Sequence, residues 1–321
     1  MGVSETQLIE RYFRQLGAPR ADVVLGIGDD AAVLRVPHDA QLVLTTDALV
    51  EGVHFVPGSP ARSLGHRSLA VNLSDIAAMG ASPCWALLAL NLPQADAHWL
   101  EEFAAGFDAL ARLHGVALVG GNLSRGALSI TVQLAGVLAQ GGALRRAGAR
   151  AGDALYVSGS IGDAAAGRKC LQGELAASPA ARAYLQRRFE YPTARVELGA
   201  GLRDLASACI DVSDGLLLDA QRLLRASDCR ASIEIERLPL SSALTQSCGE
   251  LAWQQALTGG EDYELCFSAP RAQEPAIAAL ALRSATAVTR IGLLEAGSGI
   301  ELKLHNVVMQ FAASGFDHFQ A

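Results

Sequence analysis

The chain has 321 residues, a length above the usual size of one domain, so the sequence predicts two domains that share one site. Half of the residues are hydrophobic, 18% are charged, and only 5% are aromatic. The formal net charge is −7 and no basic block occurs, which argues against a nucleic acid or an acidic membrane as a partner.

The first half of the chain alternates between helical and strand patterns. Ser4 and Gln7 form a capping-box pattern, which predicts an N-terminal helix that ends at Gly17. Further elements are expected in chain order: a strand over 42–44 that ends at Thr45-Thr46-Asp47, a helix over 62–79, a helix that begins after Asp96, a strand over 116–119 and a strand over 128–138.

A glycine- and arginine-rich stretch over 141–152 interrupts both periodicities and is interpreted as a linker. The second half then predicts a strand over 154–157, a Gly-Ser-Ile-Gly turn with a helix after it, a strand over 208–212, a helix over 215–226, a strand near 233–235 and a strand over 263–267.

Signals for export or membrane insertion are not expected in this chain. The N-terminus has the pattern of a capped helix rather than a signal peptide, and no apolar run reaches membrane-spanning length. The six cysteines are scattered without a C-x-x-C pair, as is typical of small buried side chains in a reducing compartment. A cytoplasmic location is therefore predicted.

Acidic residues cluster beside glycines and at the ends of the predicted elements. The clusters contain Asp29 and Asp30, Asp47, Asn72 and Asp75, Asp211 and Asp214, and Glu261 and Asp262. A single such acid is more often a helix cap or a turn former. Five clusters in apolar surroundings favour ligands, because a buried acid is costly unless it is hydrogen-bonded or coordinated. Oxygen donors without paired histidines or thiolates favour Mg²⁺, so the pattern indicates metal-bridged phosphates.

The usual nucleotide-binding motifs are missing from the sequence. Gly162 to Lys169 imitates a P-loop, but Gly167 is followed by Arg168 and not by the required Lys-Ser/Thr. No G-x-G-x-x-G follows a strand, and the protein-kinase signatures are absent. The residues alone therefore indicate a magnesium-phosphate enzyme without a P-loop.

Six motifs together resemble the thiamine-monophosphate kinase family, in the expected order and over nearly the whole chain. They are Gly26–Val33 (GIGDDAAV), Thr45–Phe55 (TTDALVEGVHF), Asn72–Gly80 (NLSDIAAMG), Asp211–Leu216 (DVSDGL), Gly259–Glu264 (GGEDYE) and Gly315–Phe319 (GFDHF). The resemblance implies Mg²⁺-dependent transfer of the ATP γ-phosphate to thiamine monophosphate. It also implies the two-domain α/β fold of the aminoimidazole-ribonucleotide-synthetase superfamily, in which the N-terminal sheets pair in a homodimer.

The resemblance also implies a division of labour along the chain. Residues 1–140 would form a domain for ATP, Mg²⁺ and dimerisation, and 150–321 an α/β domain that completes the active site. No catalytic residue is expected beyond those that position metal and substrates. The expected magnesium ligands are Asp29, Asp30, Thr45, Thr46, Asp47, Asp75, Asn122, Asp211 and Asp214; the nucleotide contacts are His114, Gly121, Asn122, Arg146 and Ser213; the substrate contacts are His54, Glu261 and Phe319.

One position departs from the family pattern. Many members have Gly-Gly-Asp where this chain has Gly120-Gly121-Asn122. The amide oxygen of asparagine can still coordinate a cation with one negative charge fewer. Asn122 is therefore expected to remain near the metals and to bind one ion more weakly.

Four alternative functions remain open at the level of sequence. A purine-pathway synthetase shares the superfamily. Selenophosphate synthetase normally needs a reactive Cys or selenocysteine near its N-terminus, whereas the first cysteine here is Cys84, and hydrogenase-maturation enzymes end in a cysteine-bearing tail that Phe319-Gln320-Ala321 lacks. A non-catalytic magnesium-nucleotide regulator is disfavoured by the acids kept in nearly every metal motif.

Overall fold

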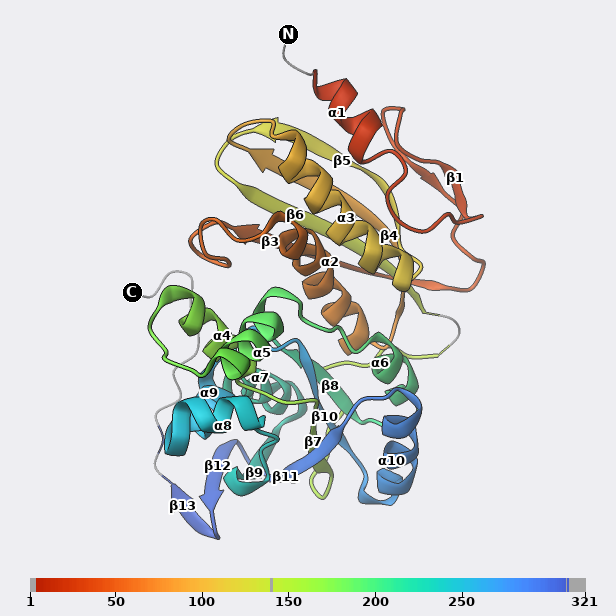
Figure 1. Ribbon diagram of the computed structural model, residues 1–321. Coiled ribbons are helices and arrows are strands. Elements are labelled where there is room, and N and C mark those ends of the chain that lie inside the picture. Colours follow the sequence, from red (N-terminus) through yellow and green to blue (C-terminus); the bar gives the residue numbers. More distant parts are fainter. Residues whose placement is uncertain (1–3, 139–140, 310, 312–321) are drawn as a thin grey trace. The chain divides into compact units, whose positions relative to one another are not determined.

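The computed structural model describes residues 4–138, 141–309 and 311 (Figure 1). Two compact units are found, Met1–Ile76 with Ala81–Gly141, and Ala77–Gly80 with Gly142–Ala321. Both units combine helices with β-sheets, so the predicted α/β class is confirmed.

The described strands of the first unit form a four-stranded sheet in the order β3-β6-β4-β5 and a separate β1-β2 hairpin. The β4–β5 pair is parallel and the other pairs of the large sheet are antiparallel. The helices are α1 (Glu5–Tyr12), α2 (Ala61–Ala78) and α3 (Ala97–Leu113), and the strands are β1 (Val23–Leu25), β2 (Val33–Leu34), β3 (Gln41–Val50), β4 (Ser82–Leu92), β5 (Ala117–Arg125) and β6 (Ser129–Leu138).

The two faces of the first sheet differ in what covers them. Helices α2 and α3 lie over one face (Figure 1). On the other face, the β1-β2 hairpin packs Val23 and Leu34 against Trp85. This second face is uncovered along strand β3, where the side chain of Leu42 is 45% exposed and that of Leu44 is 74% exposed. We call this second face, with Leu42, Leu44, Thr46, Leu87 and Asn122, the open face.

The described strands of the second unit form a seven-stranded mixed sheet in the order β13-β12-β9-β11-β7-β10-β8. Its strands are β7 (Ala154–Ser158), β8 (Ala208–Val212), β9 (Cys229–Glu234), β10 (Glu264–Ala269), β11 (Val288–Ala296), β12 (Gly299–Leu304) and β13 (Val307–Met309). Its helices are α4 (Asp163–Gln172), α5 (Pro179–Glu190), α6 (Val196–Leu202), α7 (Leu216–Ser227), α8 (Ser242–Cys248), α9 (Ala252–Thr258) and α10 (Glu274–Arg283), with short 3₁₀ turns at Ile235–Arg237, Gly249–Leu251 and Arg271–Gln273.

Both faces of this second sheet are buried. Successive side chains of a strand point to opposite faces. In β7, Leu155 and Val157 belong to one hydrophobic core, whereas Ala154 and Tyr156 belong to another. The ends of these strands are therefore where polar groups can reach the surface.

The local signals for helices are confirmed, while three strand predictions need correction. Ser4 and Gln7 form both hydrogen bonds of the capping box, and Asp96 caps α3. The strand expected over 42–44 continues through Thr45-Thr46-Asp47 to Val50, so the predicted end of the strand at these residues is wrong. The reason is that β3 pairs with β6 in unbroken register from Gln41 to Val50. Similarly, Gly120-Gly121-Asn122 lies inside β5 and not after it. The strand expected near 233–235 ends at Glu234, and Ile235 begins a 3₁₀ turn.

The cysteines lie mainly in the cores. Cys84, Cys170, Cys209, Cys229 and Cys266 are buried, and all six cysteines are free thiols. Burial raises the pKa of the Cys84 thiol to about 11. In the described part of the chain, none of the helices combines the length and the apolar composition needed to cross a membrane.

Candidate active site

A cavity of about 1240 Å³ lies on the open face of the first unit. It is lined by helix α1, by the loop over 26–32 and by all four strands of the large sheet. The predicted site residues among its lining are Asp29, Asp30, Thr45, Thr46, Gly121 and Asn122. The structure therefore brings these predicted metal and nucleotide ligands together around one cavity, except that the hydroxyl of Thr45 bonds to Asp75 on the other side of the sheet.

The charge of this cavity does not suit a bare phosphate. Asp29 and Asp30 are exposed, and the Asp30 backbone N–H donates to Oδ1 of Asp29 at 2.8 Å. Among the described lining residues Arg14 is the single basic one, and it is paired with Glu10. Phosphates in this cavity would need additional cations.

Strand β5 presents bare backbone to the cavity at Gly121. A Cβ atom on Gly121 would lie 1.8 Å from the carbonyl oxygen of Leu88 on the neighbouring parallel strand β4, so only glycine fits at this position of β5. The next residue, Asn122, is exposed and donates from Nδ2 to Oγ of Ser124 at 2.8 Å. Asn122 opposes Ala89 of β4, and Thr46 opposes Gln133 of β6. These register positions place Asn122 and Thr46 on the same face of the sheet, the open face.

A second group of predicted ligands lies on the helix-covered face of the same sheet. The hydroxyl of Thr45 donates to Oδ2 of Asp75 on α2 at 2.5 Å. Asp47 follows Thr45 by two residues in β3 and therefore lies on the same face. The Thr-Thr-Asp sequence thus sends Thr46 to one face and its two neighbours to the other.

The two predicted histidine contacts have different surroundings. Nδ1 of His54 accepts the backbone N–H of Val50 at 3.1 Å, which closes the turn after β3. His114 caps the C-terminus of α3 and is partly buried. Burial, and secondarily the nearby His66, lower the pKa of His114.

In the second unit, the predicted ligands Asp211, Ser213 and Asp214 follow one another at the end of β8 and the start of α7. Oδ2 of the buried Asp219 accepts the backbone N–H groups of Ser213 and Asp214 at 3.0 and 2.9 Å. Arg222 donates to Asp214 at 2.5 Å and to Asp219 at 2.7 Å. Burial raises the pKa of Asp219 to about 6.

Arg146 lies in the irregular segment before β7, with an exposed side chain and a carbonyl oxygen that accepts the Ser227 hydroxyl at 2.9 Å. The predicted contact Phe319 lies outside the described residues.

Glu261 belongs to a turn that is attached to this β8–α7 junction. The Glu261 N–H donates to the carbonyl of Ser213 at 2.8 Å, and the Tyr263 N–H donates to that of Val212 at 2.9 Å. Glu261 is partly exposed. Two motifs that lie far apart in the sequence, DVSDGL and GGEDYE, therefore form one structural feature.

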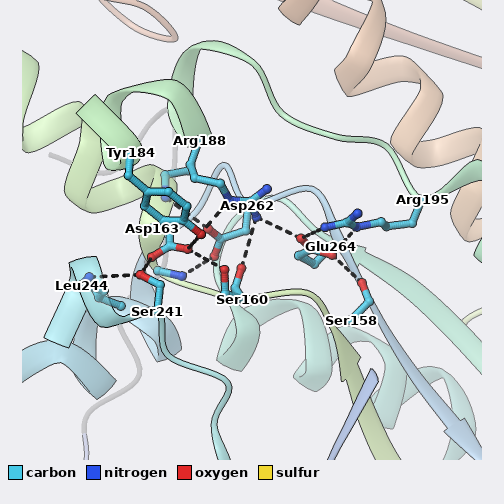
Figure 2. A network of polar contacts seen from close by, with 12 residues as sticks. Ser158, Ser160, Asp163, Tyr184, Arg188, Arg195, Ser241, Leu244, Asp262 and Glu264 are labelled. Atoms are coloured by element: carbon cyan, nitrogen blue, oxygen red, sulfur yellow. Dashed lines mark hydrogen bonds and ion pairs between the residues drawn. The ribbon is translucent and has the colours of Figure 1, made fainter. Parts of the chain in front are cut away.

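Sequence reasoning missed a buried polar network behind this turn (Figure 2). Its acids are Asp163, Asp262 and Glu264, each at most 1% exposed. Arg188 and Arg195 donate to Glu264 at 2.6 to 2.9 Å, and burial holds the pKa of Asp262 well above its usual range. Two of the three acids, Asp262 and Glu264, stand in the GGEDYE motif, so the motif contained a signal for the network. The arginines that donate to Glu264 lie about seventy residues away in the sequence.

No three His, Cys, Asp or Glu side chains of the described residues gather closely enough to hold a metal ion. The chemistry of the predicted donors nevertheless fits Mg²⁺, since carboxylate, hydroxyl and amide oxygens surround the cavity. Mg²⁺ in phosphoryl-transfer sites is usually held by one or two carboxylates together with substrate phosphates and water, and not by an all-protein cage.

Comparisons with known proteins show the family of the chain. Residues 28–138 match the family model of the AIR synthase related protein, N-terminal domain, and 150–305 match its C-terminal domain. The thiamine-monophosphate kinases of Salmonella typhimurium and Escherichia coli K12 are each 42% identical to the chain, with 99% of both chains covered. The chain belongs to the thiamine-monophosphate kinase family.

Solved structures support the same family. A crystal structure of thiamine-monophosphate kinase from Stenotrophomonas maltophilia K279a is 46% identical, covers 88% of this chain and 92% of its own, and has a TM-score of 0.84. AaThiL, solved in complex with AMPPCP and TMP, is 35% identical with a TM-score of 0.78 and coverages of 91% and 92%.

The alternative functions are not favoured by these comparisons. The hydrogenase maturation protein HypE in complex with ATP has a TM-score of 0.79 but only 19% identity, with coverages of 98% and 96%. At that identity the likeness shows the fold alone. The kinase relatives match the same length of chain at about twice the identity.

Proposed function

We propose that the protein transfers the γ-phosphoryl group of ATP to thiamine monophosphate, producing thiamine diphosphate and ADP. The observation that carries the proposal is a cavity lined by Asp29, Asp30, Thr46, Gly121 and Asn122, in a chain 42% identical over its length to enzymes of that name. AaThiL, a relative of the same fold, was solved with an ATP analogue and TMP bound.

ATP is assigned to the open face of the first unit. Gly121 lines the cavity, and a glycine backbone can approach phosphate closely because it carries no side chain. Asn122 offers an amide, and His114, held partly buried and neutral at the end of α3, can pack or donate without adding charge. Arg146 and Ser213 of the second unit are proposed to contact the same nucleotide.

Mg²⁺ is assigned to the acids and hydroxyls that the sequence singled out: Asp29, Asp30, Thr45, Thr46, Asp47, Asp75, Asn122, Asp211 and Asp214. When bound, Mg²⁺ would neutralise charge on the nucleotide and acceptor phosphates. The pairing of Arg14 with Glu10 supports this assignment, since it leaves the described lining of the cavity without an unpaired basic side chain.

The protein's part in the chemistry is positioning. The acceptor is a phosphate monoester with a second pKa of about 6, so it is largely ionised at neutral pH and needs no strong general base. Thr45 holds Asp75 in a fixed direction, and Asp219 holds the backbone of Ser213 and Asp214. A phosphate oxygen of the substrate would then attack the γ-phosphorus in line.

Thiamine monophosphate is assigned to His54, Glu261 and Phe319. Glu261 is an anion at the surface of the second unit, and the thiazolium ring of the substrate is a cation. Phe319 would pack on a flat ring system.

The chain is also proposed to divide into a nucleotide-binding domain over 1–140 and a domain over 150–321 that completes the active site. A homodimer through the open face is proposed as well. Leu42, Leu44 and Leu87 form an exposed apolar group on that face, and a second copy of the same face is the proposed partner. Because Leu44 and Leu87 also line the cavity assigned to ATP, that cavity would lie at the edge of the dimer interface. The cytoplasm stays the predicted location of the reaction.

Two substitutions test the metal assignment. Asp47→Ala and Asp214→Ala should each severely lower ADP release that depends on thiamine monophosphate, while circular dichroism stays that of the wild type. Near-normal turnover in both variants would refute the assignment.

A Mg²⁺ titration tests the position of Asn122. The Asn122→Asp variant should be activated at a lower Mg²⁺ concentration than the wild type, and an unchanged activation curve would exclude Asn122 as a ligand.

A further inference from the structure

The side chain of Glu261 is held by Tyr263, two residues further along the chain. The hydroxyl of Tyr263 donates to Oε2 of Glu261 at 2.7 Å. Tyr263 is only 8% exposed, whereas Glu261 is partly exposed. A hydrogen bond to an ionised carboxylate from a buried donor fixes the direction of that carboxylate more strongly than a neutral pair does.

The backbone of this turn has an unusual conformation. Glu261 and Tyr263 have φ angles of +74° and +53°, in the left-handed region that side chains other than glycine rarely adopt. Residues of this kind persist only where the surroundings hold them, and they are concentrated at ligand-binding sites.

Contacts on one side of the turn hold its backbone. The N–H groups of Glu261 and Tyr263 donate to the carbonyls of Ser213 and Val212 at 2.8 and 2.9 Å. A Cβ atom on Gly260 would lie 2.3 Å from the carbonyl oxygen of Ser213, so glycine is required for this close approach. The turn therefore has a fixed position relative to the β8–α7 junction.

The two neighbouring acids, Asp262 and Glu264, anchor the other side of the turn. Asp262 accepts the backbone N–H groups of Gly162 and Ala164 at 2.7 and 3.3 Å, at the start of α4. Asp262 belongs to the network drawn in Figure 2.

Glu264 completes the anchor at the start of β10. Its Oε1 accepts from Arg188 at 2.9 Å and from Arg195 at 2.6 Å, and its Oε2 accepts from Arg195 at 2.7 Å and from Ser158 at 2.6 Å (Figure 2). Both oxygens of this fully buried carboxylate are thus already occupied. Of the three acids in the GGEDYE motif, Glu261 is the one that reaches the surface.

We propose that Tyr263 is a positioning residue, which orients the Glu261 carboxylate toward the cationic part of the acceptor substrate, on a turn anchored by Asp262 and Glu264. The inference rests on the proposed function, in which Glu261 contacts thiamine monophosphate. It gives the tyrosine of the GGEDYE motif a role in substrate affinity and not only in folding.

A double-mutant cycle tests the inference. The variants are Tyr263→Phe, which removes one hydroxyl, Glu261→Gln, and the two combined. The control is Tyr156→Phe, because the hydroxyl of Tyr156 is buried without a hydrogen-bond partner in the described structure. Each protein is measured for binding of thiamine monophosphate by calorimetry, for kcat and the KM of both substrates, and for its thermal unfolding midpoint.

Tyr263→Phe should weaken thiamine monophosphate binding about tenfold, the loss expected for one hydrogen bond to a charged group, and leave the KM for ATP unchanged. In the Glu261→Gln background the same substitution should have an effect of less than about twofold, because the partner charge is gone. Tyr156→Phe should bind as the wild type does.

Three results would overturn the inference. They are wild-type affinity in Tyr263→Phe, a tenfold loss that persists undiminished in the Glu261→Gln background, and wild-type affinity in Glu261→Gln itself. The proposed function is judged separately by the wild-type protein, which must form thiamine diphosphate in the same assay.

Discussion

The hydroxyl of Thr45 donates a 2.5 Å hydrogen bond to Oδ2 of Asp75, and this bond joins the middle of strand β3 to helix α2. The two residues are thirty positions apart in the sequence. The contact fixes the direction of the Asp75 carboxylate relative to strand β3.

Thr45→Val should therefore lower turnover by roughly one to two orders of magnitude, because the carboxylate of Asp75 loses the donor that orients it. Valine has nearly the same shape and suits a strand equally well. The measurement is kcat as a function of Mg²⁺ concentration. Thr45→Ser keeps the hydroxyl and serves as the control; equal losses in both variants would mean that the methyl group, and not the hydrogen bond, matters.

Glu264→Gln should destabilise the second unit by about 3–5 kcal/mol, because a buried charge pair loses one partner and Arg188 and Arg195 are left without their anion. Urea unfolding followed by circular dichroism gives the free energy of unfolding. Glu250→Gln, at an exposed position of the same unit, should change it by less than about 0.5 kcal/mol. Similar values for the two variants would contradict the structural role of the network.

Leu44→Asp should convert the proposed dimer to a monomer, because a charge placed on the open face cannot be paired when two copies meet. Leu44 is 74% exposed in the single chain. The molar mass from light scattering is the readout. Leu282→Asp changes an 84% exposed leucine of the second unit and should leave the mass unchanged. A wild-type protein that is monomeric at all concentrations would exclude the dimer.

His114 predicts a specific pH dependence of stability. Its pKa is lowered in the folded protein, mainly by burial, so the unfolded chain binds the proton more readily. The contribution of His114 is therefore fully present above its ordinary pKa of about 6.5 and is lost as the pH falls through its lower folded value.

His114→Asn should accordingly flatten the fall in the free energy of unfolding on going from neutral to mildly acidic pH. Urea titrations of both proteins at several pH values give the comparison. A mutant curve parallel to that of the wild type would show that His114 titrates equally in both states.

The parts of the fold that depend on local signals were predictable from the sequence. The capping box of Ser4 and Gln7 and the cap of Asp96 require only residues a few positions apart, and both helices begin where they were expected. Strand ends were less predictable. Thr45 to Asp47 continue β3 because of their partners on β6, which no local pattern reveals.

The candidate site shows the same division. Acid clusters and glycine pairs identified the phosphate chemistry, and the resemblance of six motifs supplied the substrate. The buried acids Asp262 and Glu264 stood beside Glu261 in one motif, but Arg188 and Arg195 come from other elements. Which acid binds substrate and which anchors the turn depends on these long-range contacts.

The central claim is direct transfer of a phosphoryl group from ATP to thiamine monophosphate. The most direct measurement mixes the protein with Mg²⁺, thiamine monophosphate and ATP labelled with ¹⁸O in the γ-phosphate, and follows the products by mass spectrometry. The account predicts thiamine diphosphate that carries the label in its terminal phosphate, formed in equal amount to ADP. ATP hydrolysis without labelled thiamine diphosphate, or formation of AMP in its place, would contradict it.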